Sequence, residues 1–363
     1  MLTRRDLLRS SLVAGMAAAV PTLATAATRE WRLGINTYCL RFWRWNDRQL
    51  FDYCQKEKLD AMFLQDSLDP GVMKPEHWAE VRAWTKDAGM HIETGGPSLL
   101  YKTPDGFAKS VATLRQHINR AKAMGSPIVR ALLAGDRYQM PDLPVEQSVE
   151  MGLKILREVR SQVIDAGIKV GIENHKDIQA WRTRQLIDAA GTDFVGSYLD
   201  TGNPVFVAEH PLTTVDELGP VAVSFHLRDS VVYEQAGGIA VQWVPLGEGT
   251  VDFKAVVARA AELIPAGVHI YCKPITARPP VVLPVYGEEF WTKWFPGGRT
   301  KDFVRFEAMA KRGQPWNKPH LMADLNDVRD KYMDALKIQQ MEHMTQSLAY
   351  CRKELGLGIK WRG

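Results

Sequence analysis

The stretch VGIENHKD, residues 170–177, decides the fold, because an apolar run ends there abruptly in a carboxylate, an amide and an imidazole. Two more apolar runs end in the same manner, SYLDTGNP at residues 197–204 and VSFHLRD at residues 223–229. Strands buried on both faces read as short continuous apolar runs. The three stretches therefore predict neighbouring strands of a parallel sheet, each with polar groups where the strand stops.

Short apolar runs alternate with longer amphipathic stretches from about residue 31 onward, which is typical of βα units. The expected strands span residues 31–36, 60–65, 90–94, 127–133, 168–173, 194–200, 221–226 and 268–272. The expected helices span residues 47–58, 75–88, 105–124, 145–166, 181–190, 214–218 and 252–263. This many units predicts an α/β protein with a closed (β/α)8 TIM barrel. No Gly-x-Gly-x-x-Gly follows the first strand, which argues against a dinucleotide-binding sheet.

A C-terminal extension follows the last expected strand. Residues 274–324 are rich in proline, glycine and tryptophan, and we expect an irregular segment that covers the barrel mouth or contacts a second subunit of a homo-oligomer. Residues 325–355 predict a final helix that closes the outer ring. A long loop is expected at residues 230–249. Residues 27–363 are thus interpreted as one barrel domain.

The first 26 residues indicate export of the protein and are not expected to form part of the folded domain. Arg4 and Arg5 precede a modest apolar run at residues 12–20, and the small residues 24–26 suit a cleavage after Ala26. This pattern predicts a twin-arginine signal peptide over residues 1–26, hence a precursor handled by the Tat export machinery and a periplasmic mature protein. The apolar run is too short to span a bilayer, so no membrane span is expected.

Composition narrows the classes of partner. Among 363 residues the hydrophobic share is 45%, the charged share is 24% and the net charge is +4, which is too small to indicate a nucleic-acid partner. The four cysteines form no CxxC zinc motif, and only Cys39 and Cys54 invite pairing in an oxidising compartment. The sequence thus favours a globular protein that acts on a small molecule.

Polar residues at the expected strand ends should meet at one mouth, because the carboxyl ends of barrel strands converge there. Carboxylates and imidazoles from neighbouring strands are donors that suit Mn²⁺, Mg²⁺, Co²⁺ or Zn²⁺. A lone strand-end carboxylate is usually a helix cap or an ion-pair partner, but several on consecutive strands favour a site. The candidates are Glu93, Arg130, Glu173, His175, Asp200, Asn203, His226, Arg228 and Asp229.

The motifs GIENHKD, LDTGNP, HLRD and PLGEGTVDF, in this order and spacing, resemble those of the xylose isomerase-like TIM barrels, the sugar phosphate isomerase/epimerase superfamily. The resemblance implies a divalent metal held by Glu173, Asp200 and His226, and catalysis by Glu173 or His175. It also implies substrate contacts from Asn203 and from the Arg228-Asp229 pair. The relationship of these barrels to endonuclease IV makes phosphodiester hydrolysis a third possibility, which export of the chain disfavours.

The chain departs from the family pattern after the eighth expected strand. The family has a fourth metal ligand there, a glutamate, and this sequence has Lys273. A protonated lysine cannot ligate a cation and repels one at contact distance. Three outcomes stay open: the metal persists on the other three ligands, the ammonium replaces the metal, or Lys273 itself acts as a base.

The leading hypothesis is a periplasmic isomerase or epimerase that removes a proton next to the carbonyl of a sugar or keto-sugar. A divalent metal or Lys273 would polarise the carbonyl. The alternatives are a 3-keto-glycoside lyase or hydratase that uses β-elimination, and a carbohydrate-binding protein without catalysis. Several tryptophans could stack on sugar faces or simply pack the fold, namely Trp43, Trp45, Trp291, Trp294 and Trp316.

Overall fold

The computed structural model describes residues 29–65, 73–140, 142–275, 277–323 and 332–363. It confirms the α/β TIM barrel, because a closed parallel barrel runs in the order β1-β10-β7-β6-β5-β4-β3-β2. The expected signal peptide lies outside the described residues. The barrel strands are β1 (Leu33–Asn36), β2 (Ala61–Leu64), β3 (His91–Thr94), β4 (Ile128–Leu132), β5 (Lys169–Glu173), β6 (Val195–Asp200), β7 (Ala222–Leu227) and β10 (Ile270–Cys272).

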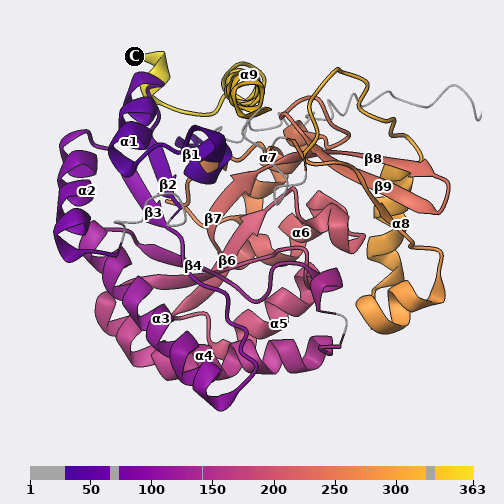
Figure 1. The fold of residues 1–363 in the computed structure, drawn as a ribbon, viewed down its shortest axis with the longest axis horizontal. Helices are drawn as coiled ribbons and strands as arrows, with labels where there is room; N and C mark the ends of the chain where they lie inside the picture. The colour runs from indigo at the N-terminus through magenta and orange to yellow at the C-terminus, as the bar shows by residue number, and fades with distance from the viewer. Residues whose placement is uncertain (1–28, 66–72, 141, 276, 324–331) are drawn as a thin grey trace, which may run out of the picture.

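Helices surround the barrel (Figure 1). The helices that follow the first seven barrel strands are α1 (Asp47–Lys56), α2 (Pro75–Asp87), α3 (Pro104–Met124), α4 (Val145–Ala166), α5 (Ala180–Ala190), α6 (Pro211–Leu218) and α7 (Phe253–Leu263). Within the described part of the chain, no helix combines the length and the apolar character needed to cross a membrane.

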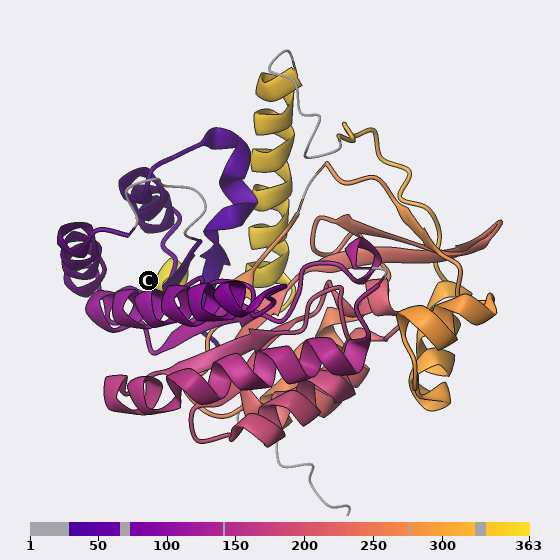
Figure 2. The same ribbon diagram turned by 60° about the horizontal axis from the view of Figure 1, so that its bottom comes forward.

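Helix α9 (Met333–Lys353) takes the eighth position of the ring, between α7 and α1. Arg352 of α9 forms an ion pair of 3.5 Å with Glu57 at the end of α1. On the other side, Lys254 of α7 lies 3.5 Å from Glu354. Figure 2 shows α9 as a long straight helix beside the 3₁₀ segment Thr37–Trp43. The expected closing helix is therefore present, although residues 324–331 lie outside the described part.

Local signals explain where the helices begin and end. The Asn46 side chain accepts a hydrogen bond from the Gln49 backbone amide, and the Gln49 side chain accepts one from the Asn46 backbone amide. This capping box starts α1. Asp252 caps α7 in a similar way. Gly125 and Gly167 end α3 and α4 in the left-handed conformation, with φ of 77° and 67°. Glycine is favoured there because a Cβ atom raises the energy of that conformation.

Two clusters of apolar side chains build the barrel, and two small ones lie at the β8–β9 hairpin and beside α9. The larger barrel cluster lies between the barrel and its helices, and it joins residues from almost every described element. The smaller barrel cluster fills the inside of the barrel and consists of Ala61, Phe63, Ile128, Tyr198 and Tyr271. A TIM barrel interior is packed with side chains in this way, so the polar groups of a site can gather only at its two ends.

The segments outside the repeat are more regular than the sequence predicts. The long loop expected at residues 230–249 is instead a hairpin of β8 (Asp229–Gln235) and β9 (Gly238–Val244). Strand β11 (Val281–Leu283) pairs with β9, and α8 (Thr300–Ala310) follows in the segment expected to be irregular. A nearly continuous apolar run such as GIAVQWV, which is buried at every position, forms a strand when a partner strand is available, and the prediction of a loop did not take this run into account.

All four cysteines are buried and unpaired. Cys39 lies in the 3₁₀ segment and Cys54 in α1, and the structure does not join them. Burial raises the pKa of the Cys39 thiol to about 12 and keeps it protonated. The pairing considered for an oxidising compartment is therefore absent among these cysteines.

One buried carboxylate joins three parts of the chain at the amino end of the barrel. Asp60 accepts hydrogen bonds from the backbone amides of Leu33 at 2.9 Å, Ile359 at 2.8 Å and Lys360 at 3.0 Å. We predict that Asp60→Asn lowers the free energy of unfolding by about 1–3 kcal/mol, because the amide keeps only one acceptor oxygen. The exposed control Asp52→Asn should change it by less than about 0.5 kcal/mol. Equal midpoints in urea unfolding of the two variants would contradict this prediction.

Candidate active site at the carboxyl end of the barrel

Five charged side chains meet where the barrel strands end. Arg130 lies in β4, Glu173 is the last residue of β5 and Asp200 is the last residue of β6. Arg228 and Lys273 directly follow β7 and β10. Parallel pairing places these strand ends at the same rim, although the residues are far apart in the sequence.

Lys273 is the centre of this cluster. Its ammonium donates hydrogen bonds to Glu173 Oε1 and to Asp200 Oδ2, each at 2.9 Å. Both carboxylates are fully buried, and Lys273 is 5% exposed. Charges removed from water in this way persist only when they are paired and hydrogen-bonded. The lysine therefore neutralises two acids that would otherwise repel each other.

Two arginines complete the pairing. Arg130 Nε lies 2.6 Å from Glu173 Oε2, and Arg228 Nη2 lies 2.6 Å from Asp200 Oδ2. Burial alone would raise the pKa of Glu173, but the charges of Arg130 and Lys273 outweigh burial and hold this pKa well below its usual range. Glu173 therefore stays ionised, and an ionised, fully bonded carboxylate is a weak proton acceptor.

A cavity of about 270 Å³ opens above the cluster. Trp243 from β9 forms part of its wall, and the Arg228 guanidinium lies 4.4 Å from the centre of the indole ring. Among the residues that the structure describes, five cationic side chains and no carboxylate line the cavity. The lining residues are Asn36, Tyr38, Gln65, Arg130, Leu132, His175, Lys176, Arg228, Trp243, Lys273, Ile275 and Arg278.

His175 is the neutral titratable group in this wall. Its Nδ1 contacts the carbonyl oxygen of Gly135, so Nδ1 carries the proton and Nε2 keeps its lone pair. Burial lowers the pKa of His175 to about 4, although the nearby Glu173 opposes the shift. The ring is therefore uncharged near neutral pH and is able to accept a proton.

His226 lies one layer below the cluster, inside the barrel. Tyr198 Oη lies 2.8 Å from its Nδ1, and Ser224 Oγ lies 2.8 Å from its Nε2. Because Ser224 donates its own proton to Glu93, His226 Nε2 carries a proton and Nδ1 accepts one from Tyr198. Among the described residues, no hydrogen bond or ion pair joins His226 to Glu173 or Asp200.

The three metal ligands implied by the family resemblance do not fit a divalent ion here. Glu173 and Asp200 converge, but on the Lys273 ammonium, and both ring nitrogens of His226 are already bonded within the interior layer. A divalent ion 4 Å from a single positive charge is repelled by about 8 kcal/mol at an intermediate dielectric. The structure therefore favours the arrangement in which the lysine stands in the place of a metal.

The other residues expected at the mouth separate into two groups. Asn203 donates to Glu173 Oε1 at 3.2 Å from behind the cluster. Asp229 accepts hydrogen bonds from the backbone amides of Gly247 and Gly249, so it holds a loop and does not line the cavity. Glu93 lies at the opposite, amino end of the barrel. Its carboxylate accepts a hydrogen bond from Ser224 and lies 3.3 Å from His91 Nε2, which keeps it away from the mouth.

Several residues of the cavity wall were not predicted from the sequence. Lys176 directly follows His175 in the motif VGIENHKD, so its position at the mouth could have been predicted from the sequence. Trp243 and Arg278 come from the hairpin and the post-barrel segment, and no sequence signal indicated them. None of the tryptophans singled out for sugar stacking lines the cavity; they pack against other side chains, as Trp43 does against Trp45.

Comparison with known proteins gives consistent matches to one fold. The family described as "Xylose isomerase-like TIM barrel" matches residues 51–280. A 3-oxo-isoapionate decarboxylase of Pectobacterium atrosepticum is 21% identical over 62% of this chain and 78% of its own length. The uncharacterized protein YihM of Escherichia coli K12 is 22% identical over 54% of this chain, and the match spans only 56% of that protein.

Solved structures match the same fold at lower sequence identity. A D-psicose 3-epimerase with D-fructose has a TM-score of 0.57 at 15% identity, covering 88% of this chain and 98% of the other. A D-tagatose 3-epimerase-like protein has a TM-score of 0.56 at 16% identity, covering 68% and 91%. A third match, the IOLI protein, was solved with zinc bound, with a TM-score of 0.51 at 15% identity, covering 67% and 88%. At these identities the structures support the fold alone.

The charge balance of the cluster predicts the effect of removing its lysine. We expect Lys273→Met to lower the free energy of unfolding at pH 7 by about 3–5 kcal/mol, because two buried carboxylates lose a shared partner. The control Lys254→Met removes an exposed lysine that pairs at 3.5 Å and should cost less than about 1 kcal/mol. Denaturant unfolding measures both, and a similar small loss in the two variants would contradict the pairing described here.

Proposed function

The chain belongs to the xylose isomerase-like TIM barrel family, and from this premise we propose that it is an enzyme that forms an enolate from a negatively charged keto-sugar. Lys273 is the proposed electrophile and His175 the proposed base. The observation that carries the proposal is the Lys273 ammonium, which occupies the point between Glu173 and Asp200 at the barrel mouth. The 3-oxo-isoapionate decarboxylase among the relatives supports an enzyme of this general kind.

Lys273 can act on a substrate while it holds the two carboxylates. An ammonium group has three N–H donors, and the described residues occupy two of them. Because the side chain lines the cavity, the third donor is available to the carbonyl oxygen of a substrate. A fixed cation stabilises the negative charge that develops on this oxygen when the neighbouring C–H bond breaks. The ammonium thus supplies what a metal supplies in a Lewis-acid mechanism.

The charge of the cavity wall indicates an anionic substrate. Arg130, Lys176, Arg228, Lys273 and Arg278 line it, and the described residues of its wall include no carboxylate. Glu173, Asp200 and Asp136 neutralise part of this charge from behind, and among the described residues the five cations outnumber these three acids. A volume of about 270 Å³ suits one monosaccharide-sized molecule. We therefore propose a keto-sugar acid, for which the carboxylate of the substrate named in the Pectobacterium relative is a precedent.

The reaction needs one base. His175 Nε2 takes the proton from the carbon next to the carbonyl, and the electrons of the C–H bond move to the carbonyl oxygen at Lys273. For isomerisation, protonated His175 returns the proton to the former carbonyl carbon, while the hydroxyl proton on the deprotonated carbon moves to the enolate oxygen. For elimination, protonated His175 gives the proton to a β-hydroxyl, which leaves as water as the enolate electrons form the new C=C bond. Glu173 is less suited to this role, because Arg130, Lys273 and Asn203 occupy its oxygens. A single base favours these two reactions over an epimerisation with two bases.

Decarboxylation is a second candidate reaction. Loss of carbon dioxide from a 3-oxo acid leaves the same enolate, which the same ammonium would stabilise. The relative described as a 3-oxo-isoapionate decarboxylase supports this route. Decarboxylation needs no proton acceptor in its first step. The effect of replacing His175 on the rate therefore distinguishes decarboxylation from proton abstraction.

We predict turnover of keto-sugar acids by the full-length mature chain in D2O, followed by proton NMR. Oxo-hexonates should gain deuterium next to the carbonyl or form products, with kcat/KM at least about tenfold above the matching neutral ketoses. His175→Asn should lower kcat by roughly 10²–10⁴. The rate should stay level from about pH 5 to about pH 8 and fall as the pH drops through about 4, because only the neutral ring accepts a proton.

The controls distinguish the alternatives. His77→Asn on α2 lies outside the cavity and should leave kcat unchanged. Release of carbon dioxide that survives in His175→Asn would favour the decarboxylase. Binding of oxo-hexonates without any exchange or product would instead support the non-catalytic carbohydrate-binding protein and contradict the proposal.

We also propose that the chain works in the periplasm after twin-arginine export. Arg4 and Arg5 ahead of a weakly apolar run support this route, and a periplasmic address suits unphosphorylated substrates. Replacing both arginines by lysine should leave the precursor in the cytoplasm, as measured by fractionation and immunoblotting. Unchanged export of that variant, with a wild-type control exported in parallel, would contradict the proposal.

A further inference from the structure

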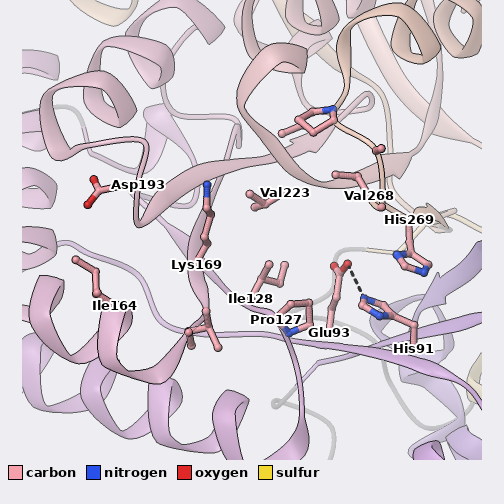
Figure 3. A pocket seen from close by; sticks show the side chains of 16 residues that line it. His91, Glu93, Pro127, Ile128, Ile164, Lys169, Asp193, Val223, Val268 and His269 are labelled. Carbon is pink, nitrogen blue, oxygen red and sulfur yellow. Dashed lines mark hydrogen bonds and ion pairs between the residues drawn. The ribbon is translucent and has the colours of Figure 1, made fainter.

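A second polar site lies at the amino end of the barrel, opposite the mouth. Here a cavity of about 620 Å³ is open to solvent. His91 at the start of β3, Glu93 in the same strand and His269 just before β10 come together on one side of it (Figure 3). Lys169 and Asp193 line the opposite side of the cavity and take no part in the group.

The three side chains are spaced as ligands of one ion. One nitrogen or oxygen atom from each lies within 4.8 Å of the other two. His91 Nε2 and Glu93 Oε1 are 3.3 Å apart, which matches the edge of about 3.4 Å in a tetrahedral site with bonds near 2.1 Å. The rings of His91 and His269 are parallel and stacked, with centroids 3.8 Å apart. Binding of both rings to one ion therefore requires one ring to turn out of this stack.

His269 presents a nitrogen without a partner among the described residues. Its Nε2 is buried and makes no hydrogen bond there. Its other ring nitrogen is hydrogen-bonded to the backbone at Gly267. In metal sites a ligating histidine usually donates its second N–H to a carbonyl or carboxylate, which fixes the tautomer and aims the free nitrogen at the ion. His269 already has this arrangement.

Glu93 provides the negative charge. Its carboxylate is 1% exposed, and within the described part of the chain no lysine or arginine pairs with it. Ser224 donates to Glu93 Oε2 at 2.5 Å and leaves Oε1 on the side of His91. Buried carboxylates are normally paired with a cation or bound to a metal. A histidine ring at 3.3 Å is a weak substitute unless it is protonated.

We propose that His91, Glu93 and His269 form a binding site for a divalent transition-metal ion, for which Zn²⁺ is the best match. Two imidazoles and one carboxylate are a donor set that zinc takes, and the cavity leaves a fourth position open to water. The ion would connect β3 to the residue before β10, which are separated by β2 and β1 in the barrel order. At the amino end of a barrel such a link stabilises the fold and takes no part in the chemistry at the mouth.

The test uses the mature full-length chain freed of metal by a chelator and then titrated with Zn²⁺ and, separately, Co²⁺. We expect one equivalent to bind and to raise the melting temperature by at least about 3 °C at 100-fold excess over Kd. Bound Co²⁺ should give the visible absorption of a tetrahedral site. His269→Asn and His91→Phe should each weaken Zn²⁺ binding at least about tenfold; the phenylalanine keeps a ring against His269 but supplies no ligand.

Control variants separate loss of metal binding from loss of folding. His77→Ala removes a histidine of α2 that pairs with Asp47, and it should bind Zn²⁺ like the parent chain. Equal melting temperatures of His91→Phe and the parent without metal would show that loss of binding is not loss of folding; if they differ, Glu93→Gln serves as the ligand variant instead. Failure to bind a stoichiometric ion, or binding that persists in His269→Asn but disappears in Asp200→Asn, would overturn the proposal.

Discussion

The structure of the active end depends on one interaction, the ammonium of Lys273 held between the carboxylates of Glu173 and Asp200. Two buried acids at this separation repel each other unless a cation lies between them. Lys273, which follows β10, provides this cation, and its ammonium lies 2.9 Å from each carboxylate. Because the cation is covalently attached, its position is set by the fold and does not depend on the supply of a metal.

The same replacement changes what the two carboxylates can do. In a site with a free divalent ion, an acid can leave the ion or move a proton. Here Arg130 binds the second oxygen of Glu173, and Arg228 shares Asp200 Oδ2 with Lys273 while the Gly202 amide donates to Oδ1. Both acids therefore serve to position cations. In the proposed function, proton transfer falls to His175, whose pKa burial lowers to about 4. The proposed chemistry thus uses a cation and an imidazole in place of a pair of acids.

A chain of hydrogen bonds connects the two ends of the barrel through its interior. It runs from Asn36 through Tyr198, His226 and Ser224 to Glu93, with donors and acceptors in one consistent direction. Every member is buried, so each bond matters for satisfying groups that water cannot reach. This chain explains why His226 lies below the mouth: its two nitrogens are both needed inside.

The sequence by itself determined the barrel, because alternating apolar runs and amphipathic stretches report burial directly, and it placed Glu173, Asp200 and Lys273 at strand ends. It could not place Glu93 or His226, since a residue near a strand end can turn toward either end of a packed interior. Nor could it assign the hairpin, whose strands are stable only beside each other. The tertiary structure decided these points because direction, pairing and charge balance depend on neighbours that are distant along the chain.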